Sequence, residues 1–94
     1  MRIDVFVWRA RFFKTRGAAT TMIAQSGVRI ERGGQVRRTE KPSVLVEAGD
    51  ILAFIGPSGP KLVRIISLPD RRGPPAEAAL CYQPLGGSGP LSPA

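Results

Sequence analysis

The chain of 94 residues contains no histidine and a single cysteine, Cys81. Without histidine, neither a Ser-His-Asp or Cys-His catalytic set nor the common zinc sites can be built. One cysteine excludes an internal disulfide, which favours a reducing, cytoplasmic setting. The seven acidic residues form no cluster along the sequence. We therefore expect no metal site, no cofactor and no enzymatic activity.

Long apolar runs are absent as well. The longest apolar stretches fall well short of the roughly 20 residues that a membrane-spanning helix needs. The first ten residues lack the apolar segment and small-residue cleavage site of a signal peptide. We therefore expect a soluble protein with no membrane partner. A chain of 94 residues forms one small domain, and a large catalytic cleft would have to come from another chain.

Basic residues, in contrast, are abundant. Fourteen Lys and Arg against seven Asp and Glu give a net charge of +7. Ten of the cations, against five of the anions, lie in residues 1–50. Arginine outnumbers lysine, and its planar guanidinium suits phosphates and base edges better than a point charge does. This balance is typical of nucleic-acid-binding domains, although excess surface charge would explain it too.

The most informative segment is Arg11-Phe12-Phe13-Lys14-Thr15-Arg16. Thr15 is a favourable N-cap for a short helix over Gly17 to Gln25, with Ser26-Gly27 as its stop, and the apolar residues of this segment recur at helical spacing. The first turn of a helix presents free backbone N–H groups, so cations beside it form a phosphate-binding surface. The segment therefore makes nucleic acid the first partner to consider.

The remaining elements follow from the spacing of apolar and turn-forming residues. Residues 3–10 fit a helix and a strand equally well. Beyond Gly27, short β-branched runs separated by turns predict strands. The predicted strands are 28–30, 51–55 and 62–68, the predicted turns are 31–35, 41–43, 47–50 and 56–60, and one or two helical turns are predicted at 76–82. Helices followed by antiparallel strands indicate an α+β domain.

Several motifs occur in an order that is typical of a known family. They are Arg2-Ile3-Asp4, Trp8, the basic run 11–16, Gly27-Val28, Lys41-Pro42-Ser43 and Gly49-Asp50. Together they resemble the RNA-binding domain named after ribosomal small-subunit protein S-four. The chain is most similar to the ribosome-associated heat-shock protein fifteen branch, which also has a counterpart of Asp70-Arg71-Arg72-Gly73-Pro74. The resemblance covers about residues 1–82.

The resemblance implies a fold in which two N-terminal helices, the first at residues 3–10, pack on a small antiparallel sheet, the alpha-L motif. We expect a single domain with the RNA-binding part at 1–68. A basic, Pro-containing extension with a short helix follows at 69–83, and residues 84–94, rich in Gly, Pro and Ser, form a disordered tail. Glu31-Arg32-Gly33-Gly34 stands where the family has a tighter Asn-Gly turn.

The resemblance also implies that RNA lies along the helix pair and the strand after it. The candidate RNA contacts are Arg2, Arg9, Arg11, Lys14, Thr15, Arg16, Arg29 and Lys41. Each has a second interpretation, as a helix cap for Thr15 and as a solvated charge for the others. Asp4 is expected to orient an arginine, because a bare carboxylate repels phosphate. Trp8, Phe12 and Phe13 favour core packing over base stacking, and the roles of Arg37, Arg38, Arg71 and Arg72 stay open.

These features predict a non-catalytic protein that binds structured RNA. By the resemblance, the RNA is ribosomal, the partner is the large ribosomal subunit, and the setting is ribosome rescue or the heat-shock response. Two alternatives stay open: an accessory RNA-recognition subunit of an RNA-modifying enzyme, and a small β-rich protein-interaction domain whose charge is incidental. The sequence identifies neither the particular RNA nor the oligomeric state, for which we favour a monomer.

Overall fold

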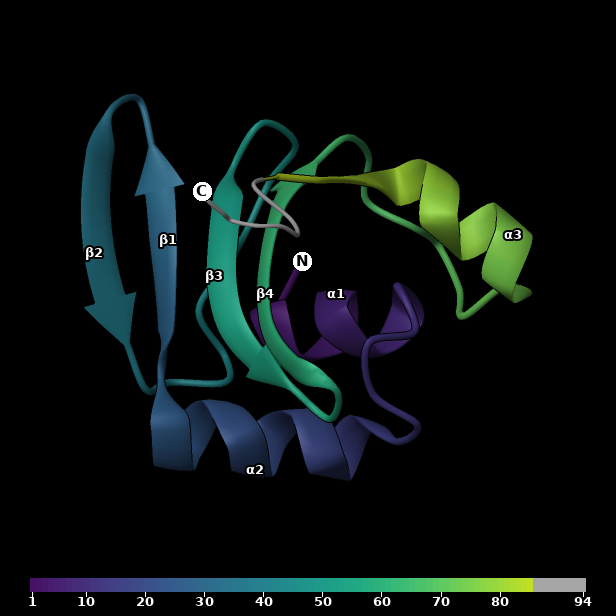
Figure 1. The fold of residues 1–94 in the computed structure, drawn as a ribbon, viewed down its shortest axis with the longest axis horizontal. Helices are drawn as coiled ribbons and strands as arrows, with labels where there is room; N and C mark the ends of the chain where they lie inside the picture. The colour runs from purple at the N-terminus through teal and green to yellow at the C-terminus, as the bar shows by residue number, and fades with distance from the viewer. Residues whose placement is uncertain (86–94) are drawn as a thin grey trace.

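The computed structural model describes residues 1–85, in which helices precede a five-stranded sheet (Figure 1). The elements are α1 (Ile3–Arg9), α2 (Arg16–Ser26), β1 (Val28–Arg32), β2 (Gln35–Thr39), β3 (Ile51–Gly56), β4 (Gly59–Ile65), α3 (Pro75–Ala78), the 3₁₀ turn η1 (Ala79–Cys81) and β5 (Tyr82–Pro84). The predicted α+β class, with two N-terminal helices and an antiparallel sheet, is confirmed. Among the described residues no helix has the length and apolarity of a membrane span.

The strands lie in the order β2-β1-β3-β4-β5, and all neighbours are antiparallel. The β1–β2 turn is tighter than the predicted turn 31–35. Arg32 pairs with Gln35, which leaves Gly33 and Gly34 as the two turn residues, with φ values of 59° and 81°. Glycine adopts positive φ without strain, so the pair forms the two-residue turn that suits twisted strands. The β3–β4 connection is equally short, since β4 begins at Gly59 rather than after the predicted loop 56–60.

The first helix settles the ambiguity over residues 3–10 in favour of the expectation from the family. Its apolar face, which includes Ile3, Phe6 and Val7, is buried. No side chain caps the helix start. Instead, the segment after β2 accepts its first N–H groups, from Ile3 to the Val44 carbonyl at 2.8 Å and from Asp4 to the Pro42 carbonyl at 3.3 Å. Helix α1 therefore depends on partners about forty residues away in sequence.

One continuous core lies between the helices and one face of the sheet. In Figure 1, α1 lies behind the sheet and α2 crosses its lower end. The largest buried apolar side chains are Phe6, Ile3, Ile23, Leu52, Ile65, Val7, Val28 and Val63. Phe12 and Phe13 pack on Phe54, with their ring centroids 5.1 and 6.2 Å, respectively, from that of Phe54. The two phenylalanines of the basic run therefore belong to the core.

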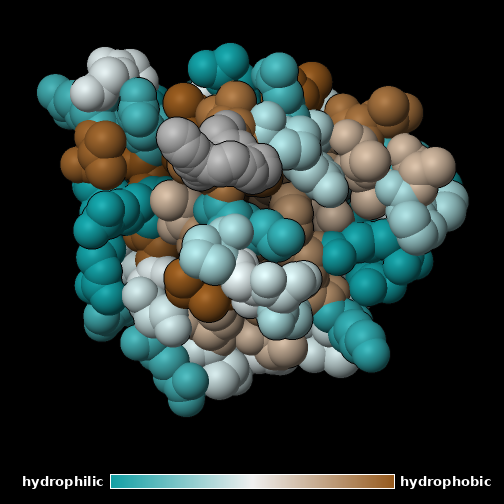
Figure 2. All heavy atoms as spheres, in the orientation of Figure 1, coloured by the Kyte–Doolittle hydropathy of each residue, from teal (hydrophilic) through white to brown (hydrophobic). Residues whose placement is uncertain are grey.

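The opposite face of the sheet carries none of the helices of residues 1–85. It is the face shown in Figure 2, where hydrophilic residues lie over β2 and apolar ones are interspersed across the middle. Arg29, Ala53 and Leu62 are paired in register across β1, β3 and β4 on this face. Exposed Ile55 and Leu62 supply part of its apolar surface.

The C-terminal part adds a strand that the sequence did not predict. The extension 69–83 contains the predicted short helix as α3 and η1, and then β5. Of the expected tail 84–94, residues 86–94 lie outside the described residues. Pro84 pairs with Val63 in β5, and the Leu85 N–H donates to the Leu62 carbonyl at 2.8 Å. The edge of the sheet therefore includes the first two residues of that segment.

Candidate nucleic-acid interface

The beginnings of α1 and α2 meet at Asp4, whose side chain is only 1% exposed. Its carboxylate accepts two hydrogen bonds from Arg2, at 3.1 and 3.0 Å, and one from the Thr20 hydroxyl at 3.1 Å. The Nε atom of Arg16 lies 3.8 Å from the same carboxylate. One buried anion thus holds two guanidinium groups, so the cluster keeps a net positive charge and Asp4 orients arginines, as expected.

The N-terminus of α2 lies beside this cluster. The Thr15 hydroxyl accepts a hydrogen bond from the Ala18 N–H at 3.0 Å and caps the helix. Lys14 and Arg16, on either side of the cap, are exposed. The first N–H groups of a helix have no intrahelical partners, and the helix dipole adds partial positive charge there. An anion at this end would therefore meet both backbone and side-chain donors.

Lys41 joins the same region from the connection between β2 and β3. The carbonyl of the next residue, Pro42, accepts the N–H of Asp4. Lys41 is exposed and forms no side-chain hydrogen bond or ion pair among residues 1–85. We call the set that gathers around Asp4 the helix-entrance surface. It consists of Arg2, Lys14, Thr15, Arg16 and Lys41.

Arg9 and Arg11 have partners inside the protein instead. Arg9 Nη1 donates to the Pro69 carbonyl at 2.9 Å, and Arg11 Nε donates to the Gly73 carbonyl at 2.6 Å. Arg72, from the extension, donates in the other direction: its Nε to the Trp8 carbonyl at 3.2 Å and its Nη2 to the Phe13 carbonyl at 3.3 Å. We call these three arginines the extension lock. Their internal role could not be predicted from local sequence, because each partner lies about sixty residues away.

Arg29 lies apart from the helix-entrance surface. It follows the C-terminus of α2, whereas Lys14 and Arg16 lie at the N-terminus. A helix of 11 residues is about 16 Å long, so these cations are separated by roughly that distance. The structure therefore does not bring all eight candidate residues together. It divides them between the helix-entrance surface, the extension lock and the end of α2.

A second buried carboxylate has a structural role. Asp50 accepts hydrogen bonds from Arg32 at 2.8 and 2.7 Å and from the Glu47 N–H at 2.9 Å. The hydrogen bonds from Arg32 hold the pKa of Asp50 below its ordinary value, although desolvation opposes this shift. The same contact raises the pKa of Arg32. This pair ties the end of β1 to the turn before β3.

The one thiol lies inside the core. Cys81 is buried, its Sγ donates to the Ala78 carbonyl at 2.9 Å, and burial raises the pKa of the thiol. It therefore packs as a core side chain and exposes no thiolate.

The cations that the protein leaves unpaired were only partly identified from the sequence. Those without a side-chain hydrogen bond or ion pair in the described part of the chain are Lys14, Arg29, Arg37, Lys41, Lys61 and Arg64. Lys61 and Arg64 were missed because each stands alone in a strand, without a motif around it. Of the two doublets left open, Arg38 and Arg71 form ion pairs with Glu40 and Glu77, both at 3.0 Å.

Comparison with known proteins agrees with this fold. The S4 domain family model matches residues 1–52, which include both N-terminal helices and the helix-entrance surface. Heat shock protein 15 of Escherichia coli K12 is 35% identical over 83 residues, which cover 88% of this chain and 59% of that protein. Its homologue in Haemophilus influenzae is 36% identical over 83 residues, covering 88% and 60%. The chain thus spans about three fifths of the length of these curated relatives.

A solved structure covers the extension as well. The trimeric structure of Vibrio cholerae heat shock protein 15 matches with a TM-score of 0.71 and 31% identity, over 89% of this chain and 80% of that one. The match extends beyond residue 52 into the part that carries Arg72 and β5. The chain therefore belongs to the S4 domain family and is homologous to heat shock protein 15.

Proposed function

We propose that the chain binds structured RNA through the helix-entrance surface and catalyses no reaction on it. The observation that carries the proposal is Asp4, which is buried and holds Arg2 and Arg16 beside the N-terminus of α2. Lys14 and Lys41 add two cations whose side chains have no partner among residues 1–85. Such a preset group of donors and charges suits the phosphates of a folded nucleic acid.

Membership of the S4 domain family supports RNA as the ligand. The major groove of an A-form helix is too narrow for side chains to read, so contacts to phosphates and to shape should dominate. Homology to heat shock protein 15 makes RNA of the large ribosomal subunit the first target to test, in ribosome rescue or the heat-shock response. Co-sedimentation with isolated large subunits measures this directly.

The side chains around the surface support a non-catalytic role. The chain has no histidine, and the thiol of Cys81 is buried with a raised pKa, so it offers no exposed thiolate. An accessory role in an RNA-modifying enzyme predicts that the chain acts only with a catalytic partner. Conversion of uridine by the isolated chain would contradict the proposal.

The double variant Lys14→Gln with Arg16→Gln tests the surface. Glutamine can still donate to Asp4, so the fold should persist while two phosphate contacts are lost. We expect the affinity for a ribosomal RNA hairpin to fall at least tenfold at low salt, about 1.4 kcal/mol or more, in a gel-shift titration.

The matched control removes two unpaired cations elsewhere, by Arg37→Gln with Arg64→Gln on β2 and β4. Its net charge equals that of the first double variant, so nonspecific electrostatics should change equally in both. Equal losses of affinity in the two double variants would show that net charge, and not the helix-entrance surface, determines binding.

A further inference from the structure

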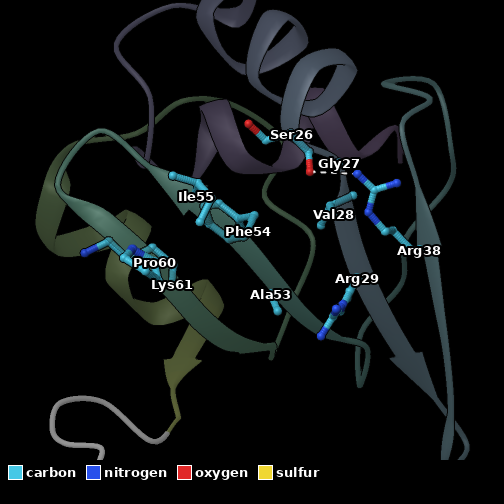
Figure 3. Close-up of a pocket in the computed structure, with 10 residues that line it drawn as sticks. All are labelled: Ser26, Gly27, Val28, Arg29, Arg38, Ala53, Phe54, Ile55, Pro60 and Lys61. Atoms are coloured by element: carbon cyan, nitrogen blue, oxygen red, sulfur yellow. Dashed lines mark hydrogen bonds between the residues drawn. The ribbon is translucent and has the colours of Figure 1, made fainter.

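The face of the sheet that carries no helix of residues 1–85 contains a groove where α2 ends. Its volume is about 260 Å³, and it is bounded by Ser26 and Gly27 at the end of α2 and by residues of β1, β2, β3 and β4 (Figure 3). The groove lies at the end of α2 that is opposite to the helix-entrance surface. We call it the α2-end groove.

Two arginines lie beside an apolar floor. Arg29 and Arg38 lie on one side in Figure 3, and the apolar side chains of Ala53 and Ile55 form the floor. Lys61 lies across β3 in register with Phe54, and its side chain points away from the two arginines. None of the lining residues is acidic. Arg29 has no hydrogen-bond or ion-pair partner in residues 1–85, so it is available to an anion.

Arg38 is held in place as a flat wall of the groove. Its Nη2 donates to the Ser26 carbonyl at 3.1 Å, and its Nη1 donates to Glu40 at 3.0 Å. The guanidinium lies so close over Gly27 that a Cβ atom there would come within 2.6 Å of Nη2, and Gly27 has a φ of 76°. Glu40 compensates the charge of Arg38. A fixed guanidinium with compensated charge is better suited to stacking on a base than to binding a phosphate.

We propose that the α2-end groove binds one unpaired nucleotide of the RNA, with its base against Arg38 and the floor of Ala53 and Ile55 and its phosphate near Arg29. The proposal rests on the proposed function, since it extends the contact from structured RNA to an adjoining single strand. A paired base shows only its edges at the surface of a duplex, whereas this groove offers flat surfaces. The arginines beside the floor and the lack of acidic lining residues favour a polyanion over a neutral peptide.

Two RNAs and one residue test the proposal. We compare a ribosomal RNA hairpin with the same hairpin carrying a single-stranded extension of about five nucleotides. By fluorescence anisotropy, the wild-type chain should bind the extended RNA about tenfold more tightly than the bare hairpin. Arg38→Gln and Arg38→Lys should both abolish this gain and leave binding of the bare hairpin unchanged. Arg64→Gln, which removes an unpaired cation from the same sheet face outside the groove, should keep the gain.

The outcomes separate this proposal from the proposed function. A bare hairpin that binds, with no gain from the extension, overturns the groove alone. If the chain does not bind the hairpin but binds the free single strand, and if that binding is lost in the Arg38 variants, only the proposed role of the helix-entrance surface is overturned. Full retention of the gain in Arg38→Lys overturns stacking, because lysine keeps the charge without the plane. Displacement of the extension by an acidic peptide of equal length would assign the groove to a protein partner instead.

A second measurement covers the case in which Arg38 variants do not fold, which thermal melts monitored by circular dichroism would reveal. With 4-thiouridine in the single-stranded extension, ultraviolet crosslinking to the wild-type chain should label the peptide that contains Ala53 to Lys61. Crosslinks found only at residues 11–16 would contradict the proposal. Arg29→Gln then serves as the binding variant in place of Arg38.

Discussion

The role of each arginine in this chain depends on the acceptor that its guanidinium can reach. Arg32 binds the buried Asp50, Arg72 binds two backbone carbonyls, and Arg29 has no partner among the described residues. A guanidinium carries five donors in a fixed plane, so bonds within the protein and bonds to an RNA phosphate compete for the same atoms. At the residue scale, a phosphate contact therefore needs a guanidinium that has no internal partner, as in Arg29, or one that keeps donors to spare, as in Arg2 and Arg16 beside Asp4.

The pair of Asp50 and Arg32 yields a prediction about pH. The carboxylate of Asp50 is almost fully buried, whereas the side chain of Arg32 is 47% exposed, so solvent screens part of the interaction. We expect Asp50→Asn to lower the free energy of unfolding by about 2 kcal/mol at neutral pH. The pKa of Asp50 is lower in the folded than in the unfolded chain. Its contribution is therefore complete above the unfolded pKa of about 3.9 and is lost as the pH falls through the folded pKa.

Urea denaturation from neutral pH to about pH 2 measures this contribution. The wild-type chain should lose stability in the acid range more steeply than Asp50→Asn does. Glu77→Gln, which removes a carboxylate paired with exposed Arg71, is the control and should follow the wild-type profile. Identical acid profiles for the wild type and Asp50→Asn would show that the pair does not stabilise the fold in this way.

At the element scale, the extension after β4 is part of the domain. The extension lock ties residues 69–73 to the end of α1 and to the loop between α1 and α2, where Arg11 has a φ of 69°. A positive φ is costly for a residue with a side chain, so the surrounding contacts must hold that loop. The loop leads directly into Lys14 and Thr15. The extension therefore supports the conformation that places the helix-entrance surface.

Arg72→Met tests this support. It removes two hydrogen bonds to backbone carbonyls and keeps an unbranched apolar stem, so we expect a loss of about 2 kcal/mol. For a domain of this size that corresponds to a fall in Tm of roughly 10 °C by differential scanning calorimetry. Limited proteolysis should also cut faster near residue 71. Arg71→Met removes only an exposed ion pair, and a comparable fall in its Tm would contradict a specific role for Arg72.

At the scale of the whole molecule, the net charge overstates the number of cations that are available to bind RNA. The chain has a net charge of +7, but more than half of its cations are bonded to its own carboxylates and carbonyls. The unpaired cations divide between the helix-entrance surface and the strands. A bare hairpin at the helix-entrance surface should therefore report only the cations gathered there.

The salt dependence of hairpin binding counts those contacts. Four cations, Arg2, Lys14, Arg16 and Lys41, predict a slope of log affinity against log salt of about −3, since each contact contributes about 0.7 to 0.9. In Lys14→Gln with Arg16→Gln the slope should fall to about −1.5. Anisotropy titrations at several salt concentrations measure both. A slope that is the same in the two proteins would exclude these residues as phosphate contacts.

Much of the fold was predictable because its signals are local. Thr15 and Gly27 define the ends of α2 through capping and positive φ, and glycine pairs define turns between β-branched runs. The order of the basic and turn motifs also identified the family. The choice between a helix and a strand at residues 3–10 could not be made from the residues themselves. Their apolar spacing fits both the helical and the strand period, and only packing on the sheet decides between the two.

By itself, then, the sequence determined the α+β class, the boundaries of α2, the excess of positive charge and the kind of family to which the chain belongs. Only the tertiary structure decided which cations are free. It turned Arg9 and Arg11 toward the extension, gathered Arg2 and Arg16 around Asp4, and formed the α2-end groove from four strands and a helix end. The reason is physical: caps and turns act over a few residues, whereas the partner of a guanidinium can lie sixty residues away in sequence.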